Sequence, residues 1–286
     1  MNDFLNLLVN GLSTGMLVFL LASGLTLIFG LMNVLNFAHG GFFVWGAFVG
    51  VWLYDQTNNL LLSFLGAVVI GMAIGWLIER LLIRPVYGNH LRQLLVTLGG
   101  MLVLIECIRM LWGSNPIRSN LPNWLDGSIQ FEGIIFIKYR LFVIIIGIMI
   151  YLALLLLLNK TKIGIMIRAG VDNKEMVQAL GINIKTVFSV VFFIGAGLAA
   201  LGGAMLGPYS GTIVADMGMQ YAILAFIVVI IGGLGKIHGA AFASILVGLA
   251  GAFTAYYLPD FTLAVNMLLL IFVLILRPQG LFGEKG

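Results

Sequence analysis

The feature that most constrains this chain is a long stretch without formal charge. Residues 4–54 contain no Asp, Glu, Lys or Arg. One helical crossing of a bilayer takes about 20 residues, so the stretch is longer than two crossings and cannot form a single transmembrane helix. It must fold back through the apolar phase at least once. The chain is therefore expected to fold in a membrane.

Composition extends this conclusion to the whole chain. Of the 286 residues, 61% are hydrophobic and 9% are charged, and the mean hydropathy is +1.12. A soluble globule with this composition could not cover itself with polar surface. The single cysteine, Cys107, excludes an internal disulfide. Because Asp3 stands where a signal peptide carries basic residues, the first apolar run is expected to be retained.

Helix-length apolar runs recur along the sequence. In lipid a backbone must satisfy its hydrogen bonds within a segment, so these runs are expected to be α-helices. We predict an all-α, polytopic transmembrane bundle of about 8–10 helices, forming one domain over residues 1–286. The uncharged link 31–39 could hold a broken or re-entrant helix, so the number of crossings stays open around nine. The predicted segments are 5–30, 40–54, 60–78, 93–112, 141–158, 187–206, 220–234, 239–258 and 261–276.

The charges in the links set the orientation. Lys and Arg gather in the links 79–92 and 160–185 and after the last segment, whereas Asp3, Asp55 and Asp216 have no basic residue nearby. By the positive-inside rule, the two basic links and the carboxyl terminus lie in the cytoplasm. Alternating crossings then place the amino terminus outside.

A short repeated pattern suggests two related halves. His-Gly-Gly-Phe-Phe at residues 39–43 resembles His-Gly-Ala-Ala-Phe at residues 238–242, and each opens an apolar run. Duplicated halves with interrupted helices are typical of transporters, in which the interruptions line the pathway. We therefore expect two duplicated halves with broken helices.

Small residues recur at helical spacing in the sixth segment. Gly195, Ala199, Gly203 and Gly207 fall four residues apart. Such stripes let helix backbones approach closely, and this packing is a main source of helix association in membranes. We interpret the stripe as helix packing within one subunit. A subunit interface or a sliding pathway helix is the alternative.

A polar island at residues 168–183 separates two apolar runs. Asp172 and Glu175 have the spacing of a capping box, and Gly181 is typical of the residue that follows a helix. These signals predict a helix of about two turns. A helix this short is unstable alone in water, so one face is expected to pack against another structure. That face carries Met176, Val177 and Leu180.

Polar residues inside the apolar runs are few. Asn33, Asn36 and His39 cluster at the break before the second run, and His238 opens the eighth. Polar and ionisable groups are costly to hold in a membrane, so they are functional candidates by default. These four residues are our candidates for a transport pathway.

The remaining motifs offer no catalytic or cofactor site. Glu106 and Arg109 are one helical turn apart and are expected to neutralise each other. Residues 195–200 match a dinucleotide pattern but follow no strand, and Gly235-Lys236 lacks the Ser or Thr of a phosphate-binding loop. No His and Cys spacing suits a metal, and no basic aromatic face suits nucleic acid. The chain is expected to bind no cofactor and to hydrolyse no ATP itself.

Several motifs together resemble one known family, the permease subunits of bacterial branched-chain amino-acid ABC importers. The resemblance covers nearly the whole chain. In such importers a cytoplasmic loop carries Glu-Ala-Ala-x-x-x-Gly, and this chain keeps Glu175 and Gly181 but has Met176 and Val177 at the two alanines. The motifs are residues 24–30, residues 36–40, the island 168–183, residues 232–235 with His238-Gly239, and the closing residues 277–283.

The resemblance implies a mechanism and a set of partners. A coupling helix at Asn173–Leu180, within a cytoplasmic coupling loop at 160–186, would sit in a cleft of an ATPase, whose closure switches the pathway. The implied partners are a second permease, related or identical, two cytoplasmic ABC ATPases, a periplasmic or lipid-anchored substrate-binding protein and membrane lipid, without nucleic acid. The implied location is the bacterial inner membrane. The residues expected at the ATPase contact are Asp172, Glu175, Met176, Val177, Leu180 and Gly181.

Other functions fit the sequence less well. The nearest alternative is the same machine carrying urea or a short amide, since those permeases share these motifs. An ion-driven secondary transporter is disfavoured because Glu106 is the one convincing intramembrane carboxylate in the sequence. A membrane enzyme is disfavoured because no nucleophile, metal set or carboxylate pair is found.

Overall fold

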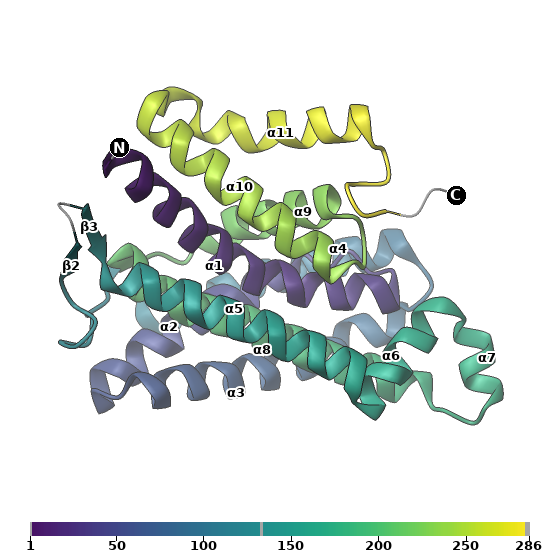
Figure 1. Cartoon of the computed structure of the whole chain (residues 1–286). Helices are drawn as coiled ribbons and strands as arrows, with labels where there is room; N and C mark the ends of the chain where they lie inside the picture. The colour runs from purple at the N-terminus through teal and green to yellow at the C-terminus, as the bar shows by residue number, and fades with distance from the viewer. Residues whose placement is uncertain (1, 132–133, 284–286) are drawn as a thin grey trace.

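Long helices make up most of the computed structural model, which describes residues 2–131 and 134–283 (Figure 1). Within these residues six helices are long and apolar enough to cross a membrane, and each predicted apolar run contains one helix. The predicted all-α polytopic bundle is therefore confirmed. The helices of the predicted runs are α1 (Asn2–Met32), α2 (Ala38–Thr57), α3 (Leu60–Ile78), α4 (His90–Trp112), α5 (Lys138–Lys160), α8 (Ile184–Ser210), α9 (Met217–Gly232), α10 (Ile237–Tyr257) and α11 (Thr262–Leu276).

Shorter elements connect these helices. A π-helical turn (Glu79–Ile83) and a 3-10 turn (Arg84–Val86) extend α3, and a further 3-10 turn (Pro259–Phe261) precedes α11. Two strands form a hairpin before α5, and two others pair across the chain. The remaining elements are β1 (Ile117–Arg118) paired with β4 (Thr212–Ile213), β2 (Ser128–Phe131) paired with β3 (Ile134–Ile137), and the helices α6 (Lys162–Asp172) and α7 (Lys174–Ala179).

The bundle has two different ends. The β2–β3 hairpin precedes α5 at one end, and α5 passes into α6 and α7 at the other (Figure 1). Tyr87, His90 and Gln178 line one cavity, so both basic links lie at the α6–α7 end. We call the two the hairpin end and the basic end. This separation of charge agrees with a cytoplasmic basic end.

Asparagine side chains begin several of the helices. The Asn59 side-chain oxygen accepts hydrogen bonds from the backbone N–H groups of Leu61 and Leu62 at the start of α3. Asn89 does the same for Arg92 at the start of α4. Each bond satisfies a backbone donor that the first helical turn leaves without an intrahelical partner.

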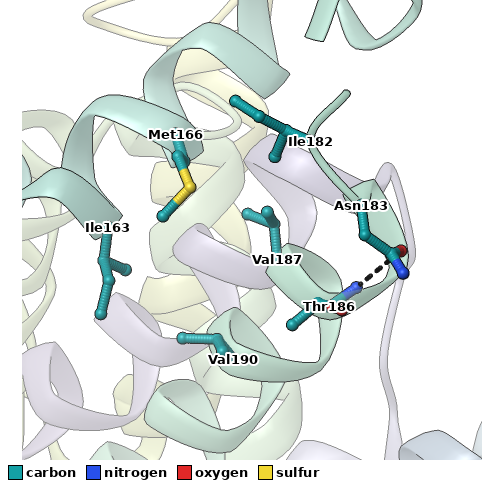
Figure 2. Close-up of a pocket in the computed structure, with 7 residues that line it drawn as sticks. All are labelled: Ile163, Met166, Ile182, Asn183, Thr186, Val187 and Val190. Atoms are coloured by element: carbon teal, nitrogen blue, oxygen red, sulfur yellow. Dashed lines mark hydrogen bonds between the residues drawn. The ribbon is translucent and has the colours of Figure 1, made fainter. Parts of the chain in front are cut away.

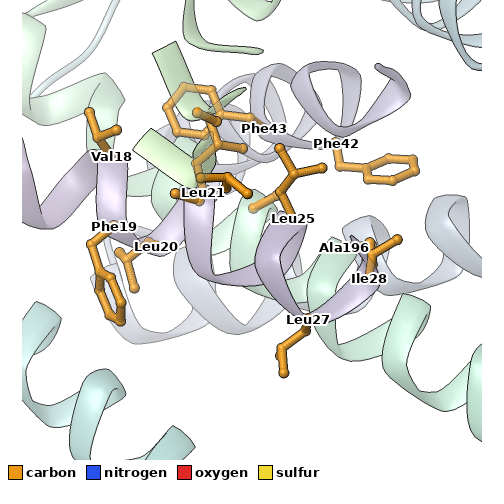
Figure 3. Packing of buried hydrophobic residues seen from close by; sticks show 14 of the residues in the cluster. Val18, Phe19, Leu20, Leu21, Leu25, Leu27, Ile28, Phe42, Phe43 and Ala196 are labelled. Atoms are coloured by element: carbon orange, nitrogen blue, oxygen red, sulfur yellow. The ribbon is translucent and has the colours of Figure 1, made fainter. Parts of the chain in front are cut away.

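The core is built around α1, the longest helix. Its middle residues are enclosed on all sides: Phe19, Leu20 and Leu21 have no exposed surface. Figure 3 shows Leu21 and Leu25 of α1 with Phe42 and Phe43 of α2 around them. A central helix that is apolar on every face is expected when neighbouring helices, rather than lipid, surround it.

Glycines set how closely the central helices approach. A Cβ atom added to Gly24 of α1 would clash with the carbonyl oxygen of Gly195 in α8. A Cβ atom added to Gly203 of α8 would clash with the carbonyl oxygen of Phe43 in α2. Gly207 likewise faces Val51 of α2. The small-residue stripe of α8, including the buried Ala199, therefore faces helices of its own chain.

The link between α1 and α2 turns back into the bundle. Residues 33–37 are non-helical, and the His39 Nε2 atom lies 2.9 Å from the Leu21 carbonyl oxygen of α1. At a rise of 1.5 Å per residue, Leu21 lies about 16 Å along the helix axis before Met32, the last residue of α1. The chain therefore runs back alongside the end of α1 before α2 begins. Because α2 then runs parallel to α8 towards the hairpin end, with Gly46 against Ala200 and Gly50 against Ala204, the broken form of this link is the alternative observed.

Two parts of the chain repeat the same order of elements in opposite directions. The first is α1, a non-helical segment, α2 and α3; the second is α8, a segment containing β4, α9 and α10. Counterparts cross at glycines: α1 meets α8 at Gly24 and Gly195, and α2 meets α9 at Gly40 and Gly218. α1 runs towards the basic end and α8 away from it (Figure 1). This arrangement agrees with two duplicated halves containing broken helices.

The sequence pattern used to detect the duplication was nevertheless wrong. His39 lies in the first turn of α2, whereas His238 lies in the first turn of α10. By element order α10 corresponds to α3, and α2 corresponds to α9. The two five-residue matches therefore mark helices that are not counterparts.

The segment after α11 returns to the bundle at the basic end. The Leu281 and Phe282 N–H groups donate to the carbonyl oxygens of Ile231 and Gly232, at 2.8 and 3.2 Å. These two acceptors are in the last turn of α9, where carbonyl groups have no intrahelical donor. The returning segment therefore completes the end of α9.

Candidate coupling site and transport pathway

Helix α7 is short but has defined ends. The Asn173 side-chain oxygen accepts a hydrogen bond from the Met176 N–H at 2.9 Å. Asn173, rather than the predicted Asp172, is thus the N-cap, and Asp172 is instead the last residue of α6. The sequence placed the cap one residue too early because Asp and Asn are equally good at this position.

The other end of α7 has the geometry that the sequence predicted. Gly181 has φ of +80°, and its N–H donates to the Gln178 carbonyl at 2.9 Å. The Ile182 N–H donates to the Val177 carbonyl at 3.2 Å. This pair of bonds is a Schellman motif, in which the positive φ favours glycine.

The apolar residues of α7 do not share one environment. Val177 is 2% exposed and lies in the chain's own core, whereas Met176 is 62% exposed and Leu180 is 74% exposed. The expected common face of the three residues is therefore wrong. Val177 attaches α7 to the bundle, and Met176 and Leu180 remain on its surface at the basic end.

A polar cavity of about 270 Å³ lies behind α7. It joins α7, the end of α1 and the start of α4, since Gln178, Asn33 and Gln93 all line it. The Gln93 Oε1 atom is buried and has no hydrogen-bond partner among the described residues. The full lining is Met32, Asn33, Tyr87, Gly88, His90, Gln93, Gln178, Ile184 and Phe188.

The break between α1 and α2 carries unusual polar groups. Asn33 has φ of +52°, a conformation that asparagine adopts more readily than most side chains. Asn36 is fully buried, and its amide nitrogen and oxygen find no partner among the described residues; the same is true of His39 Nδ1. Buried polar atoms normally have a partner, so these atoms mark a place where water or a polar ligand is needed.

His238 is not part of this group. Its Nδ1 atom lies 2.7 Å from the Tyr151 hydroxyl of α5, and it lines a different cavity from Asn33. The structure brings Asn33 to the α7 cavity and places Asn36 and His39 just beyond it along the chain. Of the four pathway candidates, His238 is the one that lies away from the α7 cavity and the break between α1 and α2.

A buried carboxylate lies beside the α7 cavity. Glu79, in the π-helical turn after α3, is 1% exposed and accepts hydrogen bonds from the Tyr87 hydroxyl and from the Ser189 hydroxyl of α8, the latter at 3.0 Å. Burial, and then the hydrogen bond to Glu79, raise the pKa of Tyr87 above its ordinary value, so this phenol stays a donor. Three elements are joined through one carboxylate.

The sequence pattern did not mark Glu79 as a buried carboxylate, because this residue falls in a link rich in basic residues. Glu106, the carboxylate that the sequence did single out, instead pairs with Arg109 on the exposed side of α4, as expected. Arg109 also binds Asp216 at 2.6 Å. The statement that Glu106 is the one candidate buried carboxylate is therefore wrong. A π-helical turn is a common signal of a functional position, but the sequence does not reveal it.

An apolar groove separates α6 from the start of α8. Its volume is about 250 Å³, and Figure 2 shows Ile163 and Met166 of α6 facing Val187 and Val190 of α8. Asn183, which caps α8 by accepting from the Thr186 N–H, lies at one side of the groove (Figure 2). The unfilled space means that α6 is less tightly packed against α8 than α1 or α2 is.

The described residues show no metal centre. Within residues 2–131 and 134–283, no group of three or more His, Cys, Asp or Glu side chains is placed to hold a metal ion.

Comparison with known proteins gives consistent matches over the length of the chain. A family model described as the branched-chain amino acid transport system / permease component matches residues 7–275. The permease protein LivH of the high-affinity branched-chain amino acid transport system of Escherichia coli (strain K12) is 30% identical, over 98% of this chain and 96% of the relative. BraD of Pseudomonas aeruginosa, described in the same terms, is 31% identical with the same coverage.

A more distant relative carries a different substrate name. The tyrosine transport system permease protein of Clostridioides difficile is 25% identical, over 79% of this chain and 72% of the relative. No solved structure matches the chain.

Proposed function

Because the chain belongs to the family of branched-chain amino acid transport permeases, we propose that it forms the translocation pathway of an ATP-driven ABC importer for leucine, isoleucine or valine. It is a multi-pass protein of the inner membrane. Its relatives are transport permeases, so ATP hydrolysis is assigned to partner subunits. The partners proposed are a second permease, related or identical, two cytoplasmic ATPases and a substrate-binding protein outside the membrane.

The observation that carries this proposal is the form of α7. It is a six-residue helix with a cap at each end, and it projects two large apolar side chains from the basic end. Exposing Met176 and Leu180 to water is unfavourable by about 1.5–3 kcal/mol for each side chain, relative to burying it. A partner subunit with an apolar cleft would remove this cost. We assign α7 as the coupling helix, with Met176 and Leu180 as the residues that enter the ATPase.

The same helix contacts the proposed pathway from its other side. Val177 anchors α7 in the core, and Gln178 shares a cavity with Asn33 and Gln93. A displacement of α7 by the ATPase would therefore change the shape of a cavity that borders the link between α1 and α2. Glu175 and Asp172, also predicted at the ATPase contact, stay sequence-based assignments.

The lining of this cavity suits a zwitterion with an aliphatic side chain. Asn33, Gln93 and Gln178 offer amide donors and acceptors without fixed charge, so an ammonium and a carboxylate can both be bound while neither is held too strongly to leave. Met32, Ile184 and Phe188 supply apolar surface in the same cavity. The existence of a tyrosine permease among the relatives supports amino acids, rather than urea or short amides, as the substrate class.

The assignment is tested by ATP-dependent uptake of leucine into vesicles that contain this chain with its partner subunits. Leu180→Ser is expected to reduce uptake at least about tenfold and to weaken ATPase association, because about 2 kcal/mol of apolar burial is lost. Leu91→Ser is the matched control, since Leu91 of α4 is also at the basic end and is 69% exposed. Equal uptake and equal ATPase association in the two variants would remove α7 from the coupling site.

The substrate is tested in the same vesicles. Uptake of leucine should be competed by isoleucine and valine and left unchanged by urea. Competition by urea alone would reassign the chain to the alternative substrate class.

A further inference from the structure

A second polar cavity opens at the basic end, away from α7. Its volume is about 310 Å³, and it lies between α5, α6 and the start of α10, with α1 behind it. Nothing in the transport proposal uses it. Its lining is Thr26, Leu27, Gly30, Leu155, Leu158, Asn159, Ile167, Arg168, Val171, Gly235, Lys236, Ile237 and His238.

The polar part of this cavity is cationic. Arg168 of α6 and Lys236 before α10 both line it, and none of the described residues in its lining is an acid. The Arg168 Nη1 atom donates to the Asn159 side-chain oxygen at 3.0 Å, which fixes the guanidinium at the edge of the cavity. A guanidinium has five N–H donors, so it can bind a second acceptor while it keeps this bond.

The start of α10 adds to the positive potential. Lys236 is the N-cap residue of α10, and its side chain makes no capping hydrogen bond to the first turn of this helix. Backbone N–H groups at a helix start and the helix dipole both favour an anion there. Here they coincide with two cationic side chains, so the cavity combines three sources of positive potential.

The rest of the cavity is apolar and continues onto the membrane-facing surface. Leu155, Leu158 and Ile237 line it. One turn further from the basic end, Leu152 of α5 and Phe242 of α10 are exposed. Between these helices the Tyr151 hydroxyl bonds His238, which joins α5 to α10 beneath the cavity. A ligand with an anionic head and a long apolar tail could fill the cavity and lie along these two helices.

We propose that this cavity binds the phosphodiester head group of an anionic phospholipid from the cytoplasmic leaflet. The basic end lies at the surface of that leaflet, and basic pockets between transmembrane helices on this side are the kind that bind such head groups. Arg168 and the first turn of α10 contact the phosphate, and Lys236 adds its charge. The acyl chains lie along Leu152 and Phe242. A free phosphate ion would leave the apolar part of the cavity empty.

The test is lipid retention by the purified full chain, measured by native mass spectrometry after incubation with phosphatidylglycerol or phosphatidylcholine. Arg168→Gln with Lys236→Gln is expected to weaken retention of phosphatidylglycerol by about 25-fold, from about fivefold for each basic residue. Arg92→Gln with Lys185→Gln is the control, because it removes the same two charges at the same end from positions outside the cavity. Val171→Trp, which narrows the cavity and keeps every charge, is expected to weaken retention as well.

Three results would each overturn the proposal. The first is equal retention by the cavity variant and its control, which would show a diffuse attraction to the basic end. The second is equal retention of phosphatidylcholine and phosphatidylglycerol by the unmodified chain. The third is displacement of phosphatidylglycerol by inorganic phosphate as effectively as by excess lipid, which would mean a site for free phosphate. These readouts do not depend on transport, so they stand apart from the proposed function.

Discussion

The middle of the bundle and its basic end are held together in different ways. In the middle, α1, α2 and α8 cross with backbone against backbone, because Gly24, Gly195 and Gly203 leave no side chain between them. At the basic end, Val177 is the buried residue among the described side chains of α7, and the hydrogen bonds at the caps of this helix are local to residues 173–182. A polar cavity lies behind α7, and an apolar groove lies between the adjoining α6 and α8.

This difference separates what must stay fixed from what must move. Close backbone contact is lost over a few tenths of an ångström, so the crossings tolerate little displacement. Hydrogen-bonded caps beside unfilled cavities tolerate more, since few apolar contacts are broken when such a segment shifts. The more adjustable part is thus the one that we propose contacts the ATPase, and the rigid part is the middle of the bundle.

The largest expected effect is at the rigid crossing. Gly203→Leu forces a side chain into the Phe43 backbone and is expected to destabilise the chain by about 3 kcal/mol or more, with loss of folded protein. Gly99→Leu is the control, because a Cβ on Gly99 meets no atom within 4 Å. Thermal stability in detergent measures both. Similar stability of the two variants would show that the crossing is adjustable after all.

The next effect is expected at the Glu79 cluster. Tyr87→Phe removes one donor from the buried carboxylate and is expected to cost about 1–3 kcal/mol, and Ser189→Ala somewhat less. The pKa of Tyr87 is raised in the folded chain, so its contribution is complete below about pH 10 and is lost as the pH rises above that value. A double-mutant cycle between Tyr87 and Ser189 gives their coupling. If the two losses of stability were fully additive and uptake were unchanged, the cluster would have no role in joining α8 to the link between α3 and α4.

A smaller, local effect is expected in α7. Asn173→Ala removes the cap and is expected to cost about 1 kcal/mol, confined to this helix. Hydrogen exchange should quicken at Met176 and its neighbours and remain unchanged in α1. Asn59→Ala, at the cap of α3, provides the comparison for a helix packed within the bundle. A global loss of stability in the Asn173 variant would contradict the independence of the basic end.

The smallest effect is expected at the exposed ion pairs of α4. Asp216→Asn breaks the bond to Arg109, which Glu106 still neutralises, so the change should stay below about 1 kcal/mol. Thermal stability in low and high salt measures it. A large loss would indicate that the start of α9 depends on this charge.

The sequence predicted the helices well because their signals are local. Apolar length located each helix, and Gly181 located the end of α7 from its own backbone requirement. Charge in the links placed both basic segments at one end. Such properties depend on neighbours along the chain, and so they can be read without knowing the packing.

What the sequence did not reveal depends on contacts between distant segments. Glu79 is buried because Tyr87 and Ser189 cover it, and Ser189 follows it by over a hundred residues. Gln93 and Gln178 matter because they meet in one cavity. The crossing of α2 with α9 was obscured by a chance likeness between residues 39–43 and 238–242. None of these contacts leaves a periodic pattern or a fixed residue spacing in the sequence, so none could be predicted from it.

The backbone bonds from Leu281 and Phe282 to the last turn of α9 carry a consequence for biosynthesis. During translation α9 enters the membrane well before these two residues leave the ribosome, so its final carbonyl groups must wait for donors made later. Until then that helix end has only water or lipid head groups as partners. A truncation before residue 281 would remove both donors and leave this helix end permanently in that immature condition.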